Sequence, residues 1–515
     1  MLNSKINLNI WFSAALCAVA GYGSFYAFHD PRYAFLIWFM PALWLAAIEG
    51  KTTSRKLLLT LIFIFMFVAT VVGGLSHYSI ILFLGTLVYG AIFVFTLLAT
   101  IIYSEKLIKD GLLRVLFLAL VWTSMEFISN AFLFAHGRCL FAYSQYANTN
   151  IIQIASLAGP YGLSFFIFFV NLLLVEFFRL LIKGAGFTGR PAFYLGLSAL
   201  VVVSLNLGGS VLRKSVDMRN SGFRIAVVQS NVPEAFEFET EKRFENLAVH
   251  TNIINEALKD SPDLVVWPES SVPGFFIDSQ EIKQKAVELA KEHGVPFLIG
   301  MDTAEDKDGV RTYYDSMVLI DKEGSIADKY YKIKLIPFAE YAPIGFLNPE
   351  RPNTPEGYVE FGAGSDFKLF SINEKRYATP ICSEIIFPEF VRKFVLKGAD
   401  FLINPTNEEW AMESDVARHQ MAMAVFRAVE NRVSVVRAAN SAFSCVIDPA
   451  GNINNLILEE DGSMLGVRGY FTGEVWFSQK RPFYSKNGNL FAWICVLISI
   501  LGGAFFAFTF PGRKA

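Results

Sequence analysis

Apolar residues dominate positions 1–212 and 488–510 of the chain, whereas residues 213–487 have the mixed pattern of a water-soluble domain. A helix needs about 20 mainly apolar residues to cross a bilayer. The pattern predicts eight such helices, at residues 6–28, 33–50, 57–74, 78–103, 112–135, 161–183, 193–212 and 488–510. We therefore expect a seven-helix transmembrane domain (1–212), a soluble domain (213–487), and an eighth helix with a short tail (488–515).

Basic residues gather in every second loop between these helices, and loops rich in Lys and Arg stay in the cytoplasm. With the N-terminus in the cytoplasm, the cytoplasmic segments hold Lys51, Arg55, Lys56, Lys106, Lys109, Arg114, Arg179, Lys183, Arg190, Arg513 and Lys514. Seven crossings then place residues 213–487 outside the cytoplasm and return both termini to it. Segment 6–28 also resembles a cleavable signal peptide, but the similar helices that follow favour a permanent span.

Predicted strands and helices alternate through residues 213–487. The runs 223–230 (FRIAVVQS) and 263–267 (DLVVW) have the continuous apolar character of buried strands. Residues 296–301 and 314–320 are also predicted to be strands. Residues 240–259 and 280–293 have helical spacing, and Gly294 suits the end of the second helix. This alternation indicates an α/β domain built from layered sheets with helices outside.

The composition excludes several classes of protein. Only 18% of residues are charged and 53% are hydrophobic, against about a quarter charged in soluble proteins. The net charge of −2 gives no electrostatic support to a nucleic-acid partner. Five cysteines in 515 residues do not form a disulfide framework. Neither metal-ligand spacing nor a phosphate-binding loop is evident, so we expect no metal and no cofactor.

Three residues are candidates for chemistry in the soluble domain. Cys382 follows an apolar run and precedes a predicted helix, where backbone N–H groups lower a thiol pKa and hold an oxyanion. Glu269 follows strand 263–267 and could act as a general base. Lys332 could stabilise an oxyanion, with Lys329 and Lys334 as rivals. Each residue also has an ordinary structural interpretation: a buried inert thiol, a surface acid and a solvated strand-end lysine.

The order and spacing of three motifs resemble the nitrilase, or carbon–nitrogen hydrolase, superfamily. The motifs are VVWPES (265–270), YKIKLIPFAEYAP (331–343) and PICSE (380–384). The resemblance implies an αββα sandwich with Glu269, Lys332 and Cys382 as catalytic residues. Lys332 is preferred to Lys334 because the family lysine precedes the glutamate of PF-x-E, here Glu340, by eight residues. The resemblance to this superfamily also implies that Glu340 and Glu384 support the catalytic residues.

AYSQY (142–146) and GPYGLSF (159–165) in the membrane half resemble the apolipoprotein N-acyltransferase family. That resemblance implies an enzyme of the bacterial inner membrane with a periplasmic nitrilase-like domain inserted in eight helices. It would act as a monomer and move an acyl chain from a phospholipid, phosphatidylethanolamine by expectation, to a diacylglyceryl-apolipoprotein. We expect four residues to contact substrate: Phe238, Trp267, Ser383 and Trp410.

Some positions depart from the family pattern. Ser383 stands where the family usually has Tyr, Phe238 stands for a Trp, and Ala442 ends a turn that normally has Gly. These changes leave open a family acyltransferase with an altered donor or acceptor. A membrane-tethered amidase would use the same three catalytic residues with water as the second substrate. A silent lipid-binding or transport protein is the third alternative, although few ionisable residues besides Glu126 lie in the predicted spans.

Overall fold

The computed structural model describes residues 9–71, 73, 80–108, 111–132, 139–232, 240–271, 280–307, 309–337, 340–341, 360–409, 415–459, 461–478 and 480–509. The chain forms two compact units. A helical unit comprises residues 1–73, 83–215 and 487–515, and an α/β unit comprises residues 74–82 and 216–486. The boundaries predicted from sequence lie at 212/213 and 487/488, and the two units meet at 215/216 and 486/487.

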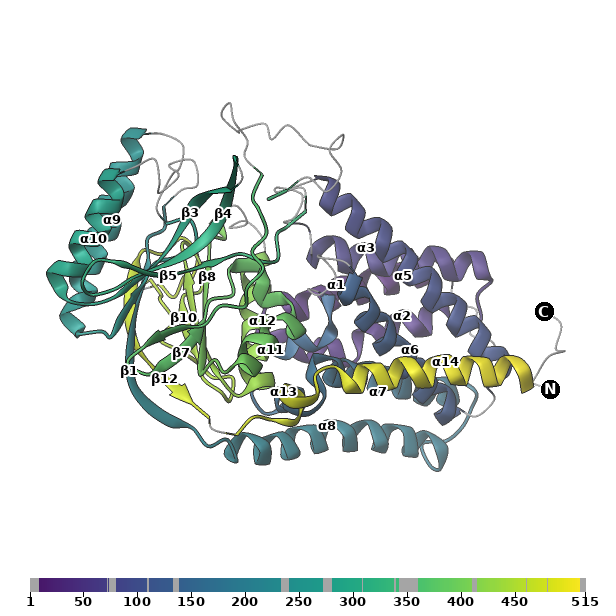
Figure 1. Cartoon of the computed structure of the whole chain (residues 1–515). Coiled ribbons are helices and arrows are strands. Elements are labelled where there is room, and N and C mark those ends of the chain that lie inside the picture. The colour runs from purple at the N-terminus through teal and green to yellow at the C-terminus, as the bar shows by residue number, and fades with distance from the viewer. Residues whose placement is uncertain are drawn as a thin grey trace. The chain divides into compact units, whose positions relative to one another are not determined.

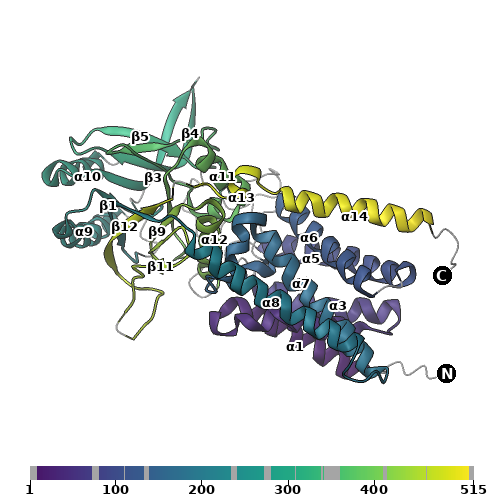
Figure 2. The ribbon, with the colours of Figure 1, turned by 90° about the horizontal axis from the view of Figure 1, so that it is seen from below.

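Long apolar helices make up the helical unit (Figures 1 and 2). They are α1 (Ile10–His29), α2 (Met40–Ile48), α3 (Thr53–Val71), α5 (Ile80–Leu107), α6 (Gly111–Phe132), α7 (Ala155–Ile182), α8 (Arg190–Lys214) and α14 (Leu490–Thr509). Short 3-10 helices η1 (Pro31–Trp38), η3 (Phe141–Gln145) and η4 (Ile151–Ile154) lie between them.

Seven described segments are long and apolar enough to cross a membrane. They are Ile10–His29, Pro31–Ile48, Thr53–Val71, Phe83–Leu107, Gly111–Asn130, Ile151–Ile182 and Arg190–Lys214. The eighth predicted span is present as α14, but its described apolar stretch, Leu490–Phe506, is shorter than these seven. The eighth crossing therefore stays a prediction.

Buried and partly buried ion pairs join helices at the ends where the sequence places its basic residues. Lys56 on α3 donates to Glu105 on α5 at 2.9 Å. Arg179 on α7 contacts Glu49, the residue that ends α2, and Glu176 on its own helix at 2.8 Å. Arg114 on α6 also pairs with Glu176. Since a charge away from water needs a partner, these pairs fix which helices adjoin.

Two six-stranded sheets form the centre of the α/β unit. The first has the order β12-β1-β2-β3-β4-β5 and the second has the order β11-β10-β9-β8-β7-β6. The first sheet contains β1 (Arg219–Gln229), β2 (Leu264–Val266), β3 (Phe297–Lys307), β4 (Val310–Ile320), β5 (Ile326–Tyr331) and β12 (Gly469–Phe477). The second contains β6 (Phe370–Ile372), β7 (Lys375–Ala378), β8 (Phe401–Thr406), β9 (Ser434–Ala439), β10 (Cys445–Ile447) and β11 (Ile453–Asn454).

Helices cover the outer faces of both sheets (Figure 1). Those beside the first sheet are α9 (Thr240–Ala257) and α10 (Gln280–His293); those beside the second are α11 (Pro388–Lys397) and α12 (Val416–Asn431). The remaining helices are η6 (Leu258–Asp260), η8 (Cys382–Ile386) and α13 (Phe483–Asn487). The inner faces of the sheets pack together, with the Phe223 ring 5.8 Å from the Phe401 ring. The predicted αββα sandwich is confirmed.

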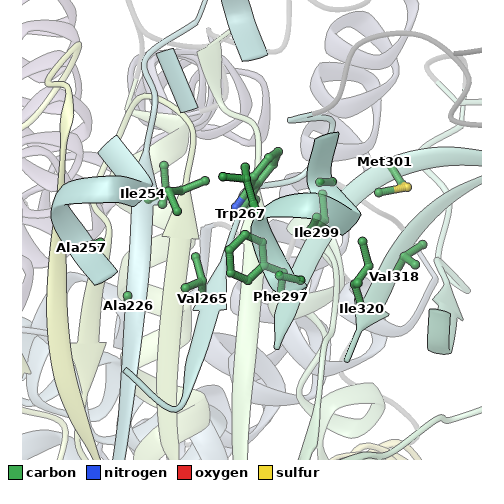
Figure 3. Packing of buried hydrophobic residues seen from close by; sticks show 14 of the residues in the cluster. Ala226, Ile254, Ala257, Val265, Trp267, Phe297, Ile299, Met301, Val318 and Ile320 are labelled. Carbon is green, nitrogen blue, oxygen red and sulfur yellow. The ribbon is translucent and has the colours of Figure 1, made fainter. Parts of the chain in front are cut away.

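Parallel pairing brings several strand ends to the same edge of each sheet. Strands β1, β2 and β3 are parallel in the first sheet, and β7, β8 and β9 are parallel in the second. Behind the first sheet, a fully buried apolar cluster includes Trp267, Val265 and Phe297 with residues of α9 and α10 (Figure 3). This core packs around the end of β2. In α/β proteins, ligand-binding sites commonly lie in the loops that follow the carboxyl ends of parallel strands.

Candidate active site

Glu269 lies in a tight turn just beyond β2. Ser270 has a positive φ of 50°, and the Ser271 hydroxyl donates to Pro268 O at 2.8 Å and to Gly300 O at 3.1 Å. A Cβ at Gly300 would lie only 2.1 Å from Pro268 O. Glycine at 300 therefore lets this turn approach β3 and aims Glu269 into the site.

Cys382 begins η8, four residues after β7 ends at Ala378. Its φ is +46°, in the left-handed region that side chains other than glycine rarely adopt. Asn404 on β8 donates from Nδ2 to Pro380 O at 2.8 Å and to Cys382 O at 3.2 Å. Thr406, at the end of β8, donates from Oγ1 to Cys382 Sγ at 3.3 Å. Contacts from β8 thus hold Cys382 in a strained turn, as is common at functional sites.

Lys332 follows β5 and is completely buried. Its backbone N donates to Asp315 O at 2.9 Å, and its carbonyl accepts from Gly364 N at 2.8 Å. A Cβ at Gly364 would lie 2.3 Å from Tyr331 O, so a glycine is needed there as well. The ammonium donates to Glu269 Oε1 at 2.7 Å, to Asp315 Oδ2 at 2.8 Å and to Glu340 Oε1 at 2.7 Å.

Among the described residues, the carboxylates of Glu269, Asp315 and Glu340 around Lys332 lie close enough together to hold a metal ion. Their ligand atoms lie within 4.8 Å of one another. Lys332 Nζ is within hydrogen-bond distance of all three acids, so the cation they share in this structure is the ammonium. Asp315 is the member of the group that sequence reasoning missed.

Burial and charge together set the proton affinities of the site. Burial raises the pKa of Glu269 to about 8, although the Lys332 ammonium opposes this rise. Burial, followed by the negative charge of Glu269, also holds the pKa of Cys382 well above its usual value. Burial alone would lower the pKa of Lys332, but its carboxylate neighbours outweigh it and keep that pKa well above the usual value. The Cys382 thiol and the Glu269 carboxyl group thus both have a raised proton affinity.

Glu384 connects the turn that carries Cys382 with the segment that carries Lys332. Its carboxylate accepts from Ile381 N at 2.8 Å, from Ile333 N at 2.7 Å and from Lys334 N at 2.9 Å. It also accepts from the Tyr330 hydroxyl at 2.7 Å. Burial raises the pKa of Glu384 to about 7, and these donors oppose the rise.

A second layer of buried polar contacts lies beneath the site. The carboxylate of Glu340 accepts from Ile336 N at 2.9 Å through its free oxygen. Glu269 Oε2 accepts from Asn407 N at 2.7 Å. Arg437 on β9 donates to Asn404 Oδ1 and to Glu408 Oε1, both at 2.8 Å. Sequence reasoning singled out neither Arg437 nor Glu408.

The structure brings together all five predicted catalytic and supporting residues. Of the rival lysines, Lys334 has its ammonium 4.9 Å from the centre of the Phe387 ring, away from the acids. Lys329 lies within β5, opposite Val318.

The predicted substrate contacts have mixed positions. Ser383 is buried and directly follows Cys382. Trp267 is fully buried in the core, where its ring stacks on His250. Phe238 and Trp410 lie outside the described residues. A substrate contact for any of the four stays a prediction.

Known proteins are similar to both the membrane half and the α/β half of this chain. A family model for carbon–nitrogen hydrolases matches residues 224–460, and one for the apolipoprotein N-acyltransferase N-terminal domain matches residues 20–173. An apolipoprotein N-acyltransferase of Geobacter metallireducens is 31% identical over 394 residues, which are 75% of this chain and 73% of that protein. The chain belongs to the apolipoprotein N-acyltransferase family.

Other relatives extend the similarity along the chain. An apolipoprotein N-acyltransferase of Thermotoga maritima is 26% identical over 492 residues, covering 90% of this chain and 88% of that protein. Among solved structures, a nitrilase-superfamily protein of Saccharomyces cerevisiae matches with 20% identity and a TM-score of 0.36, covering 49% of this chain and 89% of that chain. With the family established and seven apolar helices described, the chain is a multi-pass membrane protein.

Proposed function

We propose that this enzyme moves an acyl chain from a phospholipid to the N-terminal amine of an S-diacylglyceryl-cysteine in an apolipoprotein, through a thioester on Cys382. Family membership supports acylation of lipoproteins, and the carbon–nitrogen hydrolase match supports an acyl-enzyme. The observation that carries the mechanism is the buried contact of 2.7 Å between Lys332 and Glu269, whose charges both act on Cys382.

The first half-reaction acylates the enzyme. Glu269 takes the proton from Cys382 Sγ, and the thiolate attacks the ester carbonyl carbon of the phospholipid. A carbon–sulfur bond forms, and the carbon–oxygen bond to the glycerol then breaks. The leaving alkoxide takes the proton from Glu269 and departs as a lysophospholipid. The positive charge of Lys332 stabilises the negative charge that develops on sulfur and oxygen.

The second half-reaction transfers the acyl chain to nitrogen. The amine attacks the thioester carbonyl carbon while Glu269 accepts a proton from the nitrogen. An amide bond forms, the carbon–sulfur bond breaks, and the proton returns from Glu269 to Cys382. Water must be kept away during this interval, because hydrolysis of the thioester would release a free fatty acid.

The membrane explains how both substrates reach the site. Each buried CH₂ group of an acyl chain is worth about 0.8 kcal/mol, so a lipid with two chains does not leave the bilayer for a distant aqueous pocket. We place the protein in the bacterial inner membrane as a monomer, with the α/β unit in the periplasm and both termini in the cytoplasm. The basic loops of the sequence support this orientation, and phosphatidylethanolamine is the donor we expect.

Acyl-enzyme trapping tests the proposal. The full-length protein in vesicles of phosphatidylethanolamine with a radiolabelled acyl chain should acquire a label that neutral hydroxylamine removes, on the peptide that contains Cys382. Cys382→Ala should abolish the label. Cys445→Ala is the matched control, because Cys445 is a second buried cysteine of the same unit, on β10, and should label normally.

Addition of a diacylglyceryl peptide should then discharge the label into an amide. Release of the label mainly as free fatty acid would instead assign a hydrolase. No label from any phospholipid, or equal labelling of Cys382→Ala, would refute the mechanism.

A further inference from the structure

Asp315 is a fourth ionisable residue in direct contact with the proposed catalytic trio. It lies on β4, and its side chain is 7% exposed. Its Oδ2 accepts from Lys332 Nζ at 2.8 Å, and its carbonyl accepts from Lys332 N at 2.9 Å. Asp315 therefore accepts hydrogen bonds from both the backbone N–H and the ammonium of Lys332, the residue on which the proposed mechanism depends.

An ammonium group has three hydrogens, and all three hydrogens of Lys332 point to carboxylates in this structure. Glu269 and Glu340 take two of them, and Asp315 takes the third. The second oxygen of Asp315, Oδ1, has no hydrogen-bond partner among the described residues. One oxygen of this carboxylate thus accepts from Lys332, while the other is buried without a hydrogen-bond donor among the described residues.

Acids outnumber bases around Asp315. The groups that act on this site are Lys332 after β5, Glu269 after β2, Glu340 after β5, Cys382 on η8, and Asp302 on β3. Asp302 is the register partner of Asp315 across the β3–β4 hairpin. Four carboxyl groups thus share one ammonium. Because like charges in a buried site resist joint ionisation, the charge of Asp315 helps to raise the pKa of Glu269 and of Asp302.

We propose that Asp315 is a positioning residue for acyl transfer, which holds the third hydrogen of Lys332 and sets, through its charge, how tightly Glu269 binds the proton taken from Cys382. This inference rests on the proposed function. Asp315 touches neither substrate nor the sulfur in this account and acts through Lys332 and Glu269. The raised pKa of Glu269, to which the charge of Asp315 contributes, agrees with it.

The test measures the pH dependence of Cys382 alkylation by iodoacetamide in the full-length protein, with mass spectrometry of the Cys382 peptide as readout. Asp315→Asn keeps the shape and one acceptor oxygen but removes the charge. We expect the midpoint of alkylation to fall by about one pH unit or more, as removal of a negative charge from a buried site predicts. The acid limb of acyl-enzyme formation should move in the same direction.

Two further variants separate charge from shape. Asp315→Ser also removes the charge and should shift the midpoint as Asp315→Asn does, which keeps the test valid if one variant fails to fold. Asp315→Glu keeps the charge and should retain the wild-type midpoint. Glu323→Gln removes one charge from the exposed turn between β4 and β5 and is the matched control without a shift.

The outcomes also distinguish this inference from the proposed function. Wild-type midpoints in both neutral variants would overturn the role of Asp315, and so would an equal shift in Asp315→Glu. Alkylation needs no acyl donor, so the shift stays measurable even if no phospholipid acylates the wild-type enzyme. In that case the proposed function would fail while the electrostatic role of Asp315 stands.

Discussion

A single buried cation organises the residues of this site. Lys332 is fully buried, and a buried ammonium is tolerated only where its charge is paired and its hydrogens are bonded. Its three carboxylate partners come from different parts of the first sheet: the turn after β2, the middle of β4 and the segment after β5. The position of Lys332 therefore depends on three chain segments at once, and each of them depends on Lys332.

Replacement of Lys332 by methionine tests this dependence. Lys332→Met keeps most of the side-chain volume but leaves three buried acids without their cation. We expect acyl-enzyme formation to fall by about 100-fold or more, the usual effect of removing an electrostatic group at a reacting centre. Lys334→Met is the control, since that ammonium lies over the Phe387 ring, and it should retain near wild-type acylation. Comparable losses in both variants would contradict the assignment of Lys332.

The sequence predicted individual residues where a motif carried them. Glu269, Lys332 and Cys382 were found because each ends a recognisable strand and keeps the spacing of the carbon–nitrogen hydrolase motifs. Asp315 was missed because it lies inside a predicted strand, residues 314–320, where a single acid looks like a solvent-facing position. Only the pairing of β4 with β5 turns that acid toward Lys332. The one acidic residue in that mainly apolar predicted strand, Asp315, was the available sequence signal for a buried functional acid.

At the scale of elements, helix α12 supports the short helix η8 that begins at Cys382. Arg427 on α12 donates to Ile385 O at 3.4 Å and to Ile386 O at 3.2 Å, at the end of η8. It also pairs with Glu430 at 2.6 Å, and both side chains are fully buried. The carbonyl groups at the end of a short helix lack partners within the helix, and Arg427 supplies them.

A double-mutant cycle tests this support. Arg427→Met alone should lower the free energy of unfolding by about 3–5 kcal/mol, because it leaves Glu430 buried and unpaired. The double variant Arg427→Met, Glu430→Met should recover much of that loss. Pulsed alkylation of buried Cys445 against urea concentration reports unfolding of the α/β unit. Simple additivity of the two substitutions would contradict the pairing.

Elements were predicted well where burial is continuous and poorly where it changes along the element. The predicted strand 296–301 covers only the buried start of β3, which continues to Lys307 with Glu305 and Asp306 exposed. The predicted helix 161–183 corresponds to α7, which begins at Ala155 and contains a break at Gly159, with φ of +65°, before Pro160. Gly159 and Pro160 indicated a helix boundary in the sequence, but in the structure the helix continues after the kink.

At the scale of the molecule, the contrast between apolar and mixed segments was the most reliable signal. It predicted a helical unit formed by both ends of the chain and an α/β unit formed by the middle, and the two compact units have this composition. Composition alone could not predict that β12 pairs with β1 in the first sheet. These two strands lie at opposite ends of the α/β segment of the sequence. Nor could composition decide whether α14 crosses the membrane.

The orientation of the units is the last prediction, and single cysteines can test it. Lys322→Cys in the exposed turn after β4 and Lys183→Cys in the exposed segment after α7 should lie on opposite sides of the membrane. A membrane-impermeant maleimide added to intact spheroplasts should label the first site and should reach the second only after permeabilisation. Both sites introduce an exposed thiol in place of a lysine, so reactivity is matched. Labelling of Lys183→Cys in intact spheroplasts would invert the topology and place the proposed acyl-transfer site away from its periplasmic acceptors.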